Sequence, residues 1–175
     1  MNRNHPPGNQ VQNRSQPARL IKELSLRRHS AGGYSSLVYR SPENSEGGMP
    51  VVSIGYRMLT QDQPVVYFHR CPTVTAHYFH LGSPLQILTI DSSGALESSV
   101  LGADYSGGQR LQLFVPENSW KAMELSDGLF SLFSEVRCPH SETGSGQQTD
   151  EELRTTMTPD LRMQLQRFFN NSKRL

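Results

Sequence analysis

Short strand-like runs dominate residues 33–136 and constrain the fold more than any other feature of the sequence. Runs rich in Val, Ile, Leu, Tyr and Phe alternate with clusters of Gly, Pro, Asn, Asp and Ser. The first set of residues favours strands, and the second favours turns. We expect strands at 34–39, 50–59, 64–70, 75–81, 84–91, 95–101, 110–115, 119–125 and 129–137. Many short strands at short spacing are typical of an antiparallel sandwich or barrel, so we predict an all-β fold.

The N-terminal part is expected to hold a tail and a short helix. Residues 1–14 are rich in Asn, Gln, Pro and Arg, which is the composition of a disordered tail. Ser15 stands where it would cap a helix with the sequence QPARLIKELS, whose Leu and Ile side chains fall on one face. We therefore place the folded domain at 15–138, with this helix packed on its body.

The C-terminal part has the pattern of a helical extension. Residues 139–148 form a polar linker, and the extension is expected at 149–175. Thr149 and Glu152 match a capping box, and Thr158 precedes Pro and Asp at the start of a further helix. This helix would carry an apolar stripe formed by Leu161, Leu165, Phe168 and Phe169. The stripe must cover a surface, for which the chain's own strands are the expected choice and a partner subunit is the alternative.

The charge balance excludes some classes of partner. Lys and Arg number 17 against 16 Asp and Glu, so no net field attracts nucleic acid or an anionic membrane. No apolar run approaches the roughly 20 residues that cross a bilayer, and no secretory signal pattern is present. We therefore expect a cytoplasmic protein with no nucleic-acid or membrane partner. Cys71 and Cys138 are too few and too far apart for a disulfide framework, so both are expected to be free thiols.

Several motifs between residues 20 and 138 share the order and spacing of one protein family. They are LIKELSLRRHSAGGYSSLVYRS from residue 20, FHRCPTVTAHYFHLGSPLQILTID from residue 68, VLGADYSGGQRLQLFVPENSWKA from residue 100 and the strand ending at Val136. The chain resembles small single-domain cupins, which are often described as predicted sugar epimerases with a jelly roll like that of the dTDP-sugar epimerases. The resemblance implies a double-stranded β-helix, a homodimer and a pocket for a small molecule such as a carbohydrate or an anion.

The departures from the family pattern remove its acidic residues. The family carries carboxylates in a His-Pro-Glu motif, a Ser-Asp-Glu motif and a Gly-Glu pair. The corresponding positions here are Ala31, Val74, Thr75 and Gln109. The family's Trp-His pair is replaced by His77 and Tyr78. The resemblance therefore carries over to the fold better than to the chemistry.

The usual cupin metal site is also incomplete. The resemblance places its four ligand positions at Tyr67, His69, Thr75 and Lys121, of which only the histidine is a metal ligand. Imidazole and carboxylate together normally satisfy a divalent ion, whereas a lysine ammonium repels one. We therefore predict no metal and no other cofactor.

Strand alternation separates the histidines of the second motif. Residues of equal parity share a face, so Tyr67 and His69 point together on one strand, and Thr75 and His77 on the next. Both histidines would then face the interior. His80 has the opposite parity and is expected to face outward.

Two functions compete for this interior. The first is binding without catalysis, or with altered chemistry, and the loss of the acidic motif residues favours it. The alternative is a metal-independent sugar-nucleotide epimerase or isomerase, which needs a base and an acid on opposite faces of the substrate. His69 or His77 would be the base and Tyr67 or Tyr78 the acid, although no carboxylate is expected near the histidines to orient them. A purely structural subunit is a third possibility.

Other side chains are candidates for binding the ligand. Basic residues would hold an anionic group, while an amide or an aromatic ring would contact a sugar. The candidate ligand-binding residues are Arg40, Arg70, Gln112, Trp120 and Lys121.

Overall fold

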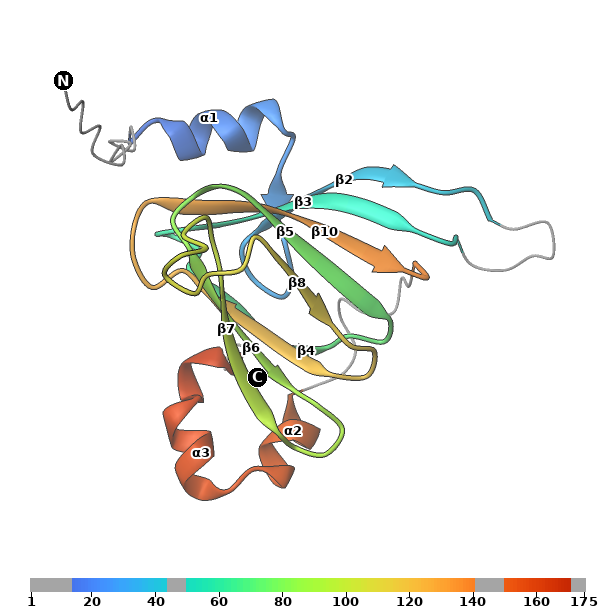
Figure 1. Ribbon diagram of the computed structural model, residues 1–175, viewed down its shortest axis with the longest axis vertical. Helices are drawn as coiled ribbons and strands as arrows, with labels where there is room; N and C mark the ends of the chain where they lie inside the picture. The colour runs from blue at the N-terminus through green and yellow to red at the C-terminus, as the bar shows by residue number, and fades with distance from the viewer. Residues whose placement is uncertain (1–13, 44–49, 141–149, 171–175) are drawn as a thin grey trace.

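Two antiparallel sheets face each other in the computed structural model, which describes residues 14–43, 50–140 and 150–170 (Figure 1). The six-stranded sheet has the order β1 (Arg27–Arg28), β2 (Tyr34–Arg40), β3 (Ser53–Thr60), β10 (Phe130–Cys138), β5 (Val74–Gly82) and β8 (Gln112–Val115). The four-stranded sheet has the order β4 (Val65–Arg70), β9 (Trp120–Glu124), β6 (Leu85–Ile90) and β7 (Leu96–Leu101). The chain crosses repeatedly between the sheets, as in a jelly roll, and this confirms the predicted all-β class.

Every expected strand is present, with its ends shifted by at most a few residues. The sequence pattern missed β1, whose two arginines pair with Tyr34 and Ser35 of β2. Such a short exposed strand carries no hydrophobic alternation that would reveal it. The expected tail and linker lie outside the described residues, except for Arg14, Pro139 and His140, and so does Thr149.

The barrel interior is apolar at one end. Alternate residues of both sheets point into it, so strands from each contribute to a single core. The core consists of Leu59, Val66, Cys71, Leu85, Ile87, Leu101, Leu113, Val115, Met123, Leu125 and Phe133. Both cysteines are free, as expected, and Cys71 is buried here while Cys138 is exposed.

Helix α1 (Gln16–Glu23) packs against the outer face of the six-stranded sheet (Figure 1). Its Leu20 and Ile21 contact a cluster that includes Met58 and Phe130. Ser15 stands at the N-cap, but its side chain makes no capping hydrogen bond to the helix. The proline in the first turn and the apolar face are therefore what favour a helix here.

The C-terminal helices cover the outer face of the four-stranded sheet (Figure 1). They are α2 (Glu151–Thr156), α3 (Pro159–Gln164) and the 3-10 helix η2 (Gln166–Phe168). Thr158 caps α3, since its side chain accepts a hydrogen bond from the backbone N–H of Leu161. The expected apolar stripe packs on the chain's own strands, where Phe168 and Phe169 contact Phe68.

Candidate functional site

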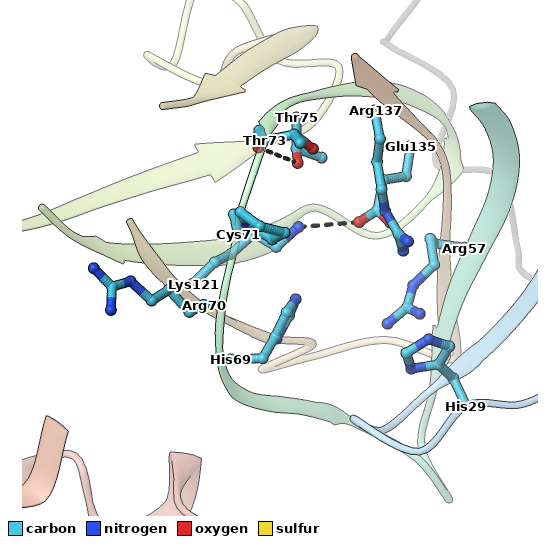
Figure 2. A pocket seen from close by; sticks show the side chains of 11 residues that line it. His29, Arg57, His69, Arg70, Cys71, Thr73, Thr75, Lys121, Glu135 and Arg137 are labelled. Carbon is cyan, nitrogen blue, oxygen red and sulfur yellow. Dashed lines mark hydrogen bonds and ion pairs between the residues drawn. The ribbon is translucent and has the colours of Figure 1, made fainter. Parts of the chain in front are cut away.

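A small polar cavity occupies the other end of the barrel interior (Figure 2). Its volume is about 20 Å³, which is room for roughly one water molecule. The walls are formed by His29, Arg57, His69, Arg70, Cys71, Pro72, Thr73, Thr75, Lys121, Glu135 and Arg137. In the view of Figure 2, the two histidines and Arg57 lie on one side and the two threonines on the other.

Lys121 joins three strands through a buried network. Its side chain is 2% exposed, and its Nζ donates to Glu135 Oε2 at 3.0 Å. The same Nζ lies 3.1 Å from Nε2 of His77. Because an ammonium can only donate, His77 Nε2 accepts and the ring proton sits on Nδ1, 3.9 Å from Glu135 Oε2. The lysine is thus held between a neutral imidazole and a carboxylate.

Glu135 corrects the expectation that no carboxylate lies near the histidines. It comes from β10, outside the family motifs, and stands directly opposite His77 in the β5–β10 ladder. Its other oxygen accepts hydrogen bonds from Arg137 at 2.9 and 2.5 Å. A carboxylate missing from the motifs is therefore supplied by the neighbouring strand.

Arg57 places a further cation in this cavity. It is 4% exposed, and one terminal nitrogen donates to the backbone oxygen of Gly32 at 3.2 Å. Its Nε is buried and has no hydrogen-bond partner among the described residues. The guanidinium remains protonated in proteins, so its charge persists although burial lowers its pKa.

The ionisable groups of the cavity have strongly displaced pKa values. Burial raises the pKa of the Glu135 carboxyl, but Lys121, Arg137 and Arg57 outweigh it and hold that pKa well below 4.5. Burial and then Lys121 lower the pKa of His69 to about 3, and the same two causes lower the pKa of His77. The carboxylate is therefore charged and both histidines are neutral near neutral pH.

The loop before β2 carries His29 to the cavity. Gly32 adopts φ +102°, a conformation that side chains rarely tolerate, and a Cβ there would collide with the backbone oxygen of Val65. The neighbouring Ala31 oxygen accepts a hydrogen bond from the Tyr67 N–H at 2.7 Å, which ties the loop to β4. The position of His29 therefore depends on this glycine.

A second cavity of about 180 Å³ adjoins the first. The two share His29, Arg57, Glu135 and Arg137 as lining residues. A ligand in the larger cavity would therefore also meet the charged cluster.

Three of the predicted site residues line the small cavity: His69, Arg70 and Lys121. His69 faces inward, as the alternation predicts. Arg70 is at the edge, where its Nε donates to the Asn118 oxygen at 3.2 Å and its Nη1 lies 3.8 Å from Glu152.

The other predicted site residues lie elsewhere. His77 is fully buried behind Lys121, and Tyr67 contributes only its backbone oxygen, which accepts a hydrogen bond from His69 Nδ1 at 2.9 Å. A register shift in β4 between Val66 and His69 interrupts the simple alternation there. Their candidate roles in acid–base chemistry stay predictions.

The remaining candidates for ligand binding do not line the cavity. Arg40 is exposed at the end of β2, and Gln112 is exposed on the edge strand β8. Trp120 is buried beneath the C-terminal helices, where it contributes to their apolar cluster. His80 faces outward as expected and bonds Ser134 Oγ at 2.6 Å.

Sequence reasoning missed Arg57, Glu135 and Arg137. All three lie on the inward face of strands that also place apolar core residues there. Leu59 follows Arg57 on β3, and Phe133 precedes Glu135 on β10. Charged residues at inward positions of a predicted strand were the available signal, because such positions are otherwise filled by the core.

The donors of the cavity do not suit a divalent cation. Four positively charged side chains line it, and Glu135 is already bound by two of them. Among residues 14–43, 50–140 and 150–170, no group of three or more His, Cys, Asp or Glu side chains is arranged to hold a metal. A metal here would meet charge repulsion from Lys121, which occupies the position of a cupin ligand.

Comparison with known proteins agrees with this fold. An uncharacterized protein of Saccharomyces cerevisiae is 29% identical over 140 residues, which are 69% of this chain and 68% of the yeast protein. The crystal structure of a protein from Shewanella oneidensis is 28% identical with a TM-score of 0.79, covering 91% of this chain and 99% of the other. A hypothetical protein from Leishmania major is 23% identical with a TM-score of 0.76, covering 88% and 98%.

No helix in the described part of the chain is long and apolar enough to span a membrane.

The family model described as Cupin superfamily (DUF985) matches residues 18–143, which include all ten described strands and the whole of the charged cavity. The chain therefore belongs to this family of the cupin superfamily.

Proposed function

We propose that this cupin binds a small anion, most simply a carboxylate, across its water-sized charged cavity and the adjoining cavity of about 180 Å³. The observation that carries the proposal is the excess of buried positive charge. Buried Arg57 and Lys121 line the cavity together with the half-buried Arg70 and Arg137, and Glu135 is the one carboxylate lining it within the described residues. Buried charges are costly unless they are paired, so a bound anion would offset the remaining cations.

Two unsatisfied groups support an anionic ligand. Arg57 Nε and Thr73 Oγ1 are buried, and neither has a hydrogen-bond partner among the described residues. Both residues line the cavity. Buried donors are almost always satisfied in folded proteins, and an oxyanion placed here would accept from both.

The size of the cavity favours a small ligand over a sugar nucleotide. Even the adjoining cavity, at about 180 Å³, is smaller than the roughly 300–1,000 Å³ that drug-sized ligands require. Among the candidate acids and bases for an epimerase, only His69 lines the small cavity. The binding function therefore has more support than the epimerase alternative.

A thermal unfolding series with small anions tests the proposal. Acetate, oxalate and sulfate would be titrated at constant ionic strength, and at least one should raise the melting temperature. A ligand at 100 times its dissociation constant stabilises the folded state by about 2.7 kcal/mol.

Matched variants locate the binding site in the same experiment. Arg57→Met should abolish the shift, whereas Arg40→Met should retain it, because Arg40 does not line the cavity. Absence of any shift with the wild-type protein would reject the proposed function. An undiminished shift with Arg57→Met would place the anion elsewhere.

The homodimer implied by the resemblance is retained as part of this proposal. The end of β2 exposes Leu37, Val38 and Tyr39, and such apolar side chains favour contact with a second copy. Sedimentation of the wild-type protein and of Leu37→Asp would test it. The pairing is contradicted if the wild-type protein sediments as a monomer at micromolar concentration.

A further inference from the structure

His69 presents a hydrogen-bond acceptor to the charged cavity. Its Nδ1 lies 2.9 Å from the backbone oxygen of Tyr67. A carbonyl oxygen can only accept, so Nδ1 carries the ring proton and Nε2 carries a lone pair. The far edge of the ring points into the cavity (Figure 2), and Nε2 has no hydrogen-bond partner among the described residues.

His29 presents the opposite group. The backbone N–H of Ala31 donates to its Nδ1 at 3.1 Å, so the ring proton must sit on Nε2. Both tautomers are thus set by backbone groups of the loop before β2 and of β4. The cavity receives one imidazole acceptor and one imidazole donor.

Both rings stay neutral near neutral pH. Burial, followed by the charge of Arg57, lowers the pKa of His29 to about 3. Burial, followed by the charge of Lys121, has the same effect on His69. Neutral rings keep the two different hydrogen-bonding edges, whereas protonation would turn both into donors.

The acceptor on His69 stands among donors. Arg57, Lys121 and the Nε2–H of His29 all present N–H groups, and a simple carboxylate would accept from them. A simple carboxylate has no hydrogen to offer His69 Nε2, which would then lose its water without gaining a partner. Such an unpaired buried acceptor costs binding free energy.

We infer that the preferred ligand is a small 2-hydroxycarboxylate, whose carboxylate meets Arg57 and Arg137 in the adjoining cavity of about 180 Å³ and whose hydroxyl fills the water-sized cavity and donates to His69 Nε2. This inference rests on the anion-binding function proposed above and adds the chemical class of the ligand. The hydroxyl oxygen can in turn accept from His29, so the two tautomers match the two faces of one O–H group. An amino acid would offer an ammonium donor, but the surrounding cations repel it.

Calorimetric titration with glycolate and acetate separates anion binding from the preference for a hydroxyl group. The ligands share a carboxylate and differ by one hydroxyl, so their affinity ratio reports the hydroxyl alone. We expect glycolate to bind the wild-type protein about tenfold more tightly than acetate, the ratio for one well-placed hydrogen bond. Methoxyacetate, which lacks the O–H donor, should show no such advantage.

Two variants locate the origin of this preference. His69→Phe keeps a ring but removes the acceptor, so glycolate and acetate should bind it equally. His80→Phe is the matched histidine control on the outer face, and it should keep the preference because His80 does not line the cavity.

The outcomes distinguish the two proposals. If neither ligand nor inorganic phosphate binds, the anion-binding function itself fails. If glycolate and acetate bind the wild-type protein equally, the site binds anions but the hydroxy-acid assignment is wrong. If methoxyacetate binds as tightly as glycolate, or if His69→Phe keeps the preference for glycolate, the role given to His69 is overturned. The methoxyacetate titration uses the wild-type protein, so it does not depend on whether a variant folds. Binding of phosphate alone also rejects the 2-hydroxycarboxylate.

Discussion

The two ends of the barrel interior are built from the same strands but differ in what they contain. On β10, Phe133 joins the apolar core, and two residues later Glu135 joins the charged cluster. The alternation of a strand determines that both side chains point inward, but not whether the surroundings suit a ring or a charge. At one end burial is favourable by itself, while at the other it must be offset by ion pairs and by a ligand.

The largest expected effect is at the apolar end. Phe133→Ala removes a fully buried ring and should lower the free energy of unfolding by about 3–5 kcal/mol. Urea denaturation measures this loss, and small anions should not change it. A loss below about 1 kcal/mol would contradict the placement of Phe133 in a close-packed core.

Glu135→Gln should cost about 3 kcal/mol, because it leaves the buried Lys121 and the half-buried Arg137 without their carboxylate. Unlike the loss at Phe133, this one should shrink when a small carboxylate such as glycolate is added, since the anion takes over part of the pairing. Comparing urea curves of both variants with and without glycolate tests the contrast between the two ends. If glycolate changed the stability of both variants equally, the two ends of the barrel would not differ in this respect.

The histidines of the charged end predict that the stability of the protein depends on pH. Their pKa in the folded protein is depressed from 6.5 to about 3 for His29 and His69, so only the unfolded chain takes up protons as the pH falls from 6.5. Stability should therefore decrease between pH 6.5 and 4.5, above the range where Glu135 begins to contribute.

A variant identifies the source of this pH dependence. His69→Phe should reduce the slope by up to about 1 kcal/mol per pH unit. Urea denaturation at several pH values measures it. Partial burial also lowers the pKa of His80 on the outer face, so His80→Phe should reduce the slope less than His69→Phe does. An unchanged slope in His69→Phe would show that this ring is not held neutral in the folded protein.

The smallest effect is expected at a charge pair outside the barrel. Glu97 and Arg110 form an exposed ion pair at 3.5 Å, with side chains 64% and 56% exposed. Surface pairs contribute about 0–1 kcal/mol, so Glu97→Gln should change stability by less than about 0.5 kcal/mol in urea denaturation. A loss as large as that of Glu135→Gln would imply that burial does not distinguish the two carboxylates.

The strands were predictable because each carries a local signal. Alternating apolar residues and turn residues located β2 to β10 within a few positions, and the motifs placed His69 and Lys121 in one cavity. The two-residue strand β1 lacked that signal. Trp120 was a candidate ligand contact, but its surroundings depend on helices from a different part of the chain.

The amino-acid sequence by itself determined the all-β jelly roll, its flanking helices and the inward direction of the two motif histidines. The resemblance to cupins implied the jelly roll. The strands, the helices and the direction of these histidines follow from residue periodicity, which acts over a few neighbouring positions. The charged cluster depended on the assembled barrel. Pairing of β5 with β10 set Glu135 opposite His77, and two backbone groups distant in sequence selected the tautomer of each cavity imidazole. Long-range strand register is not encoded in any single segment, and so the chemistry of this cavity emerges only when the sheets close.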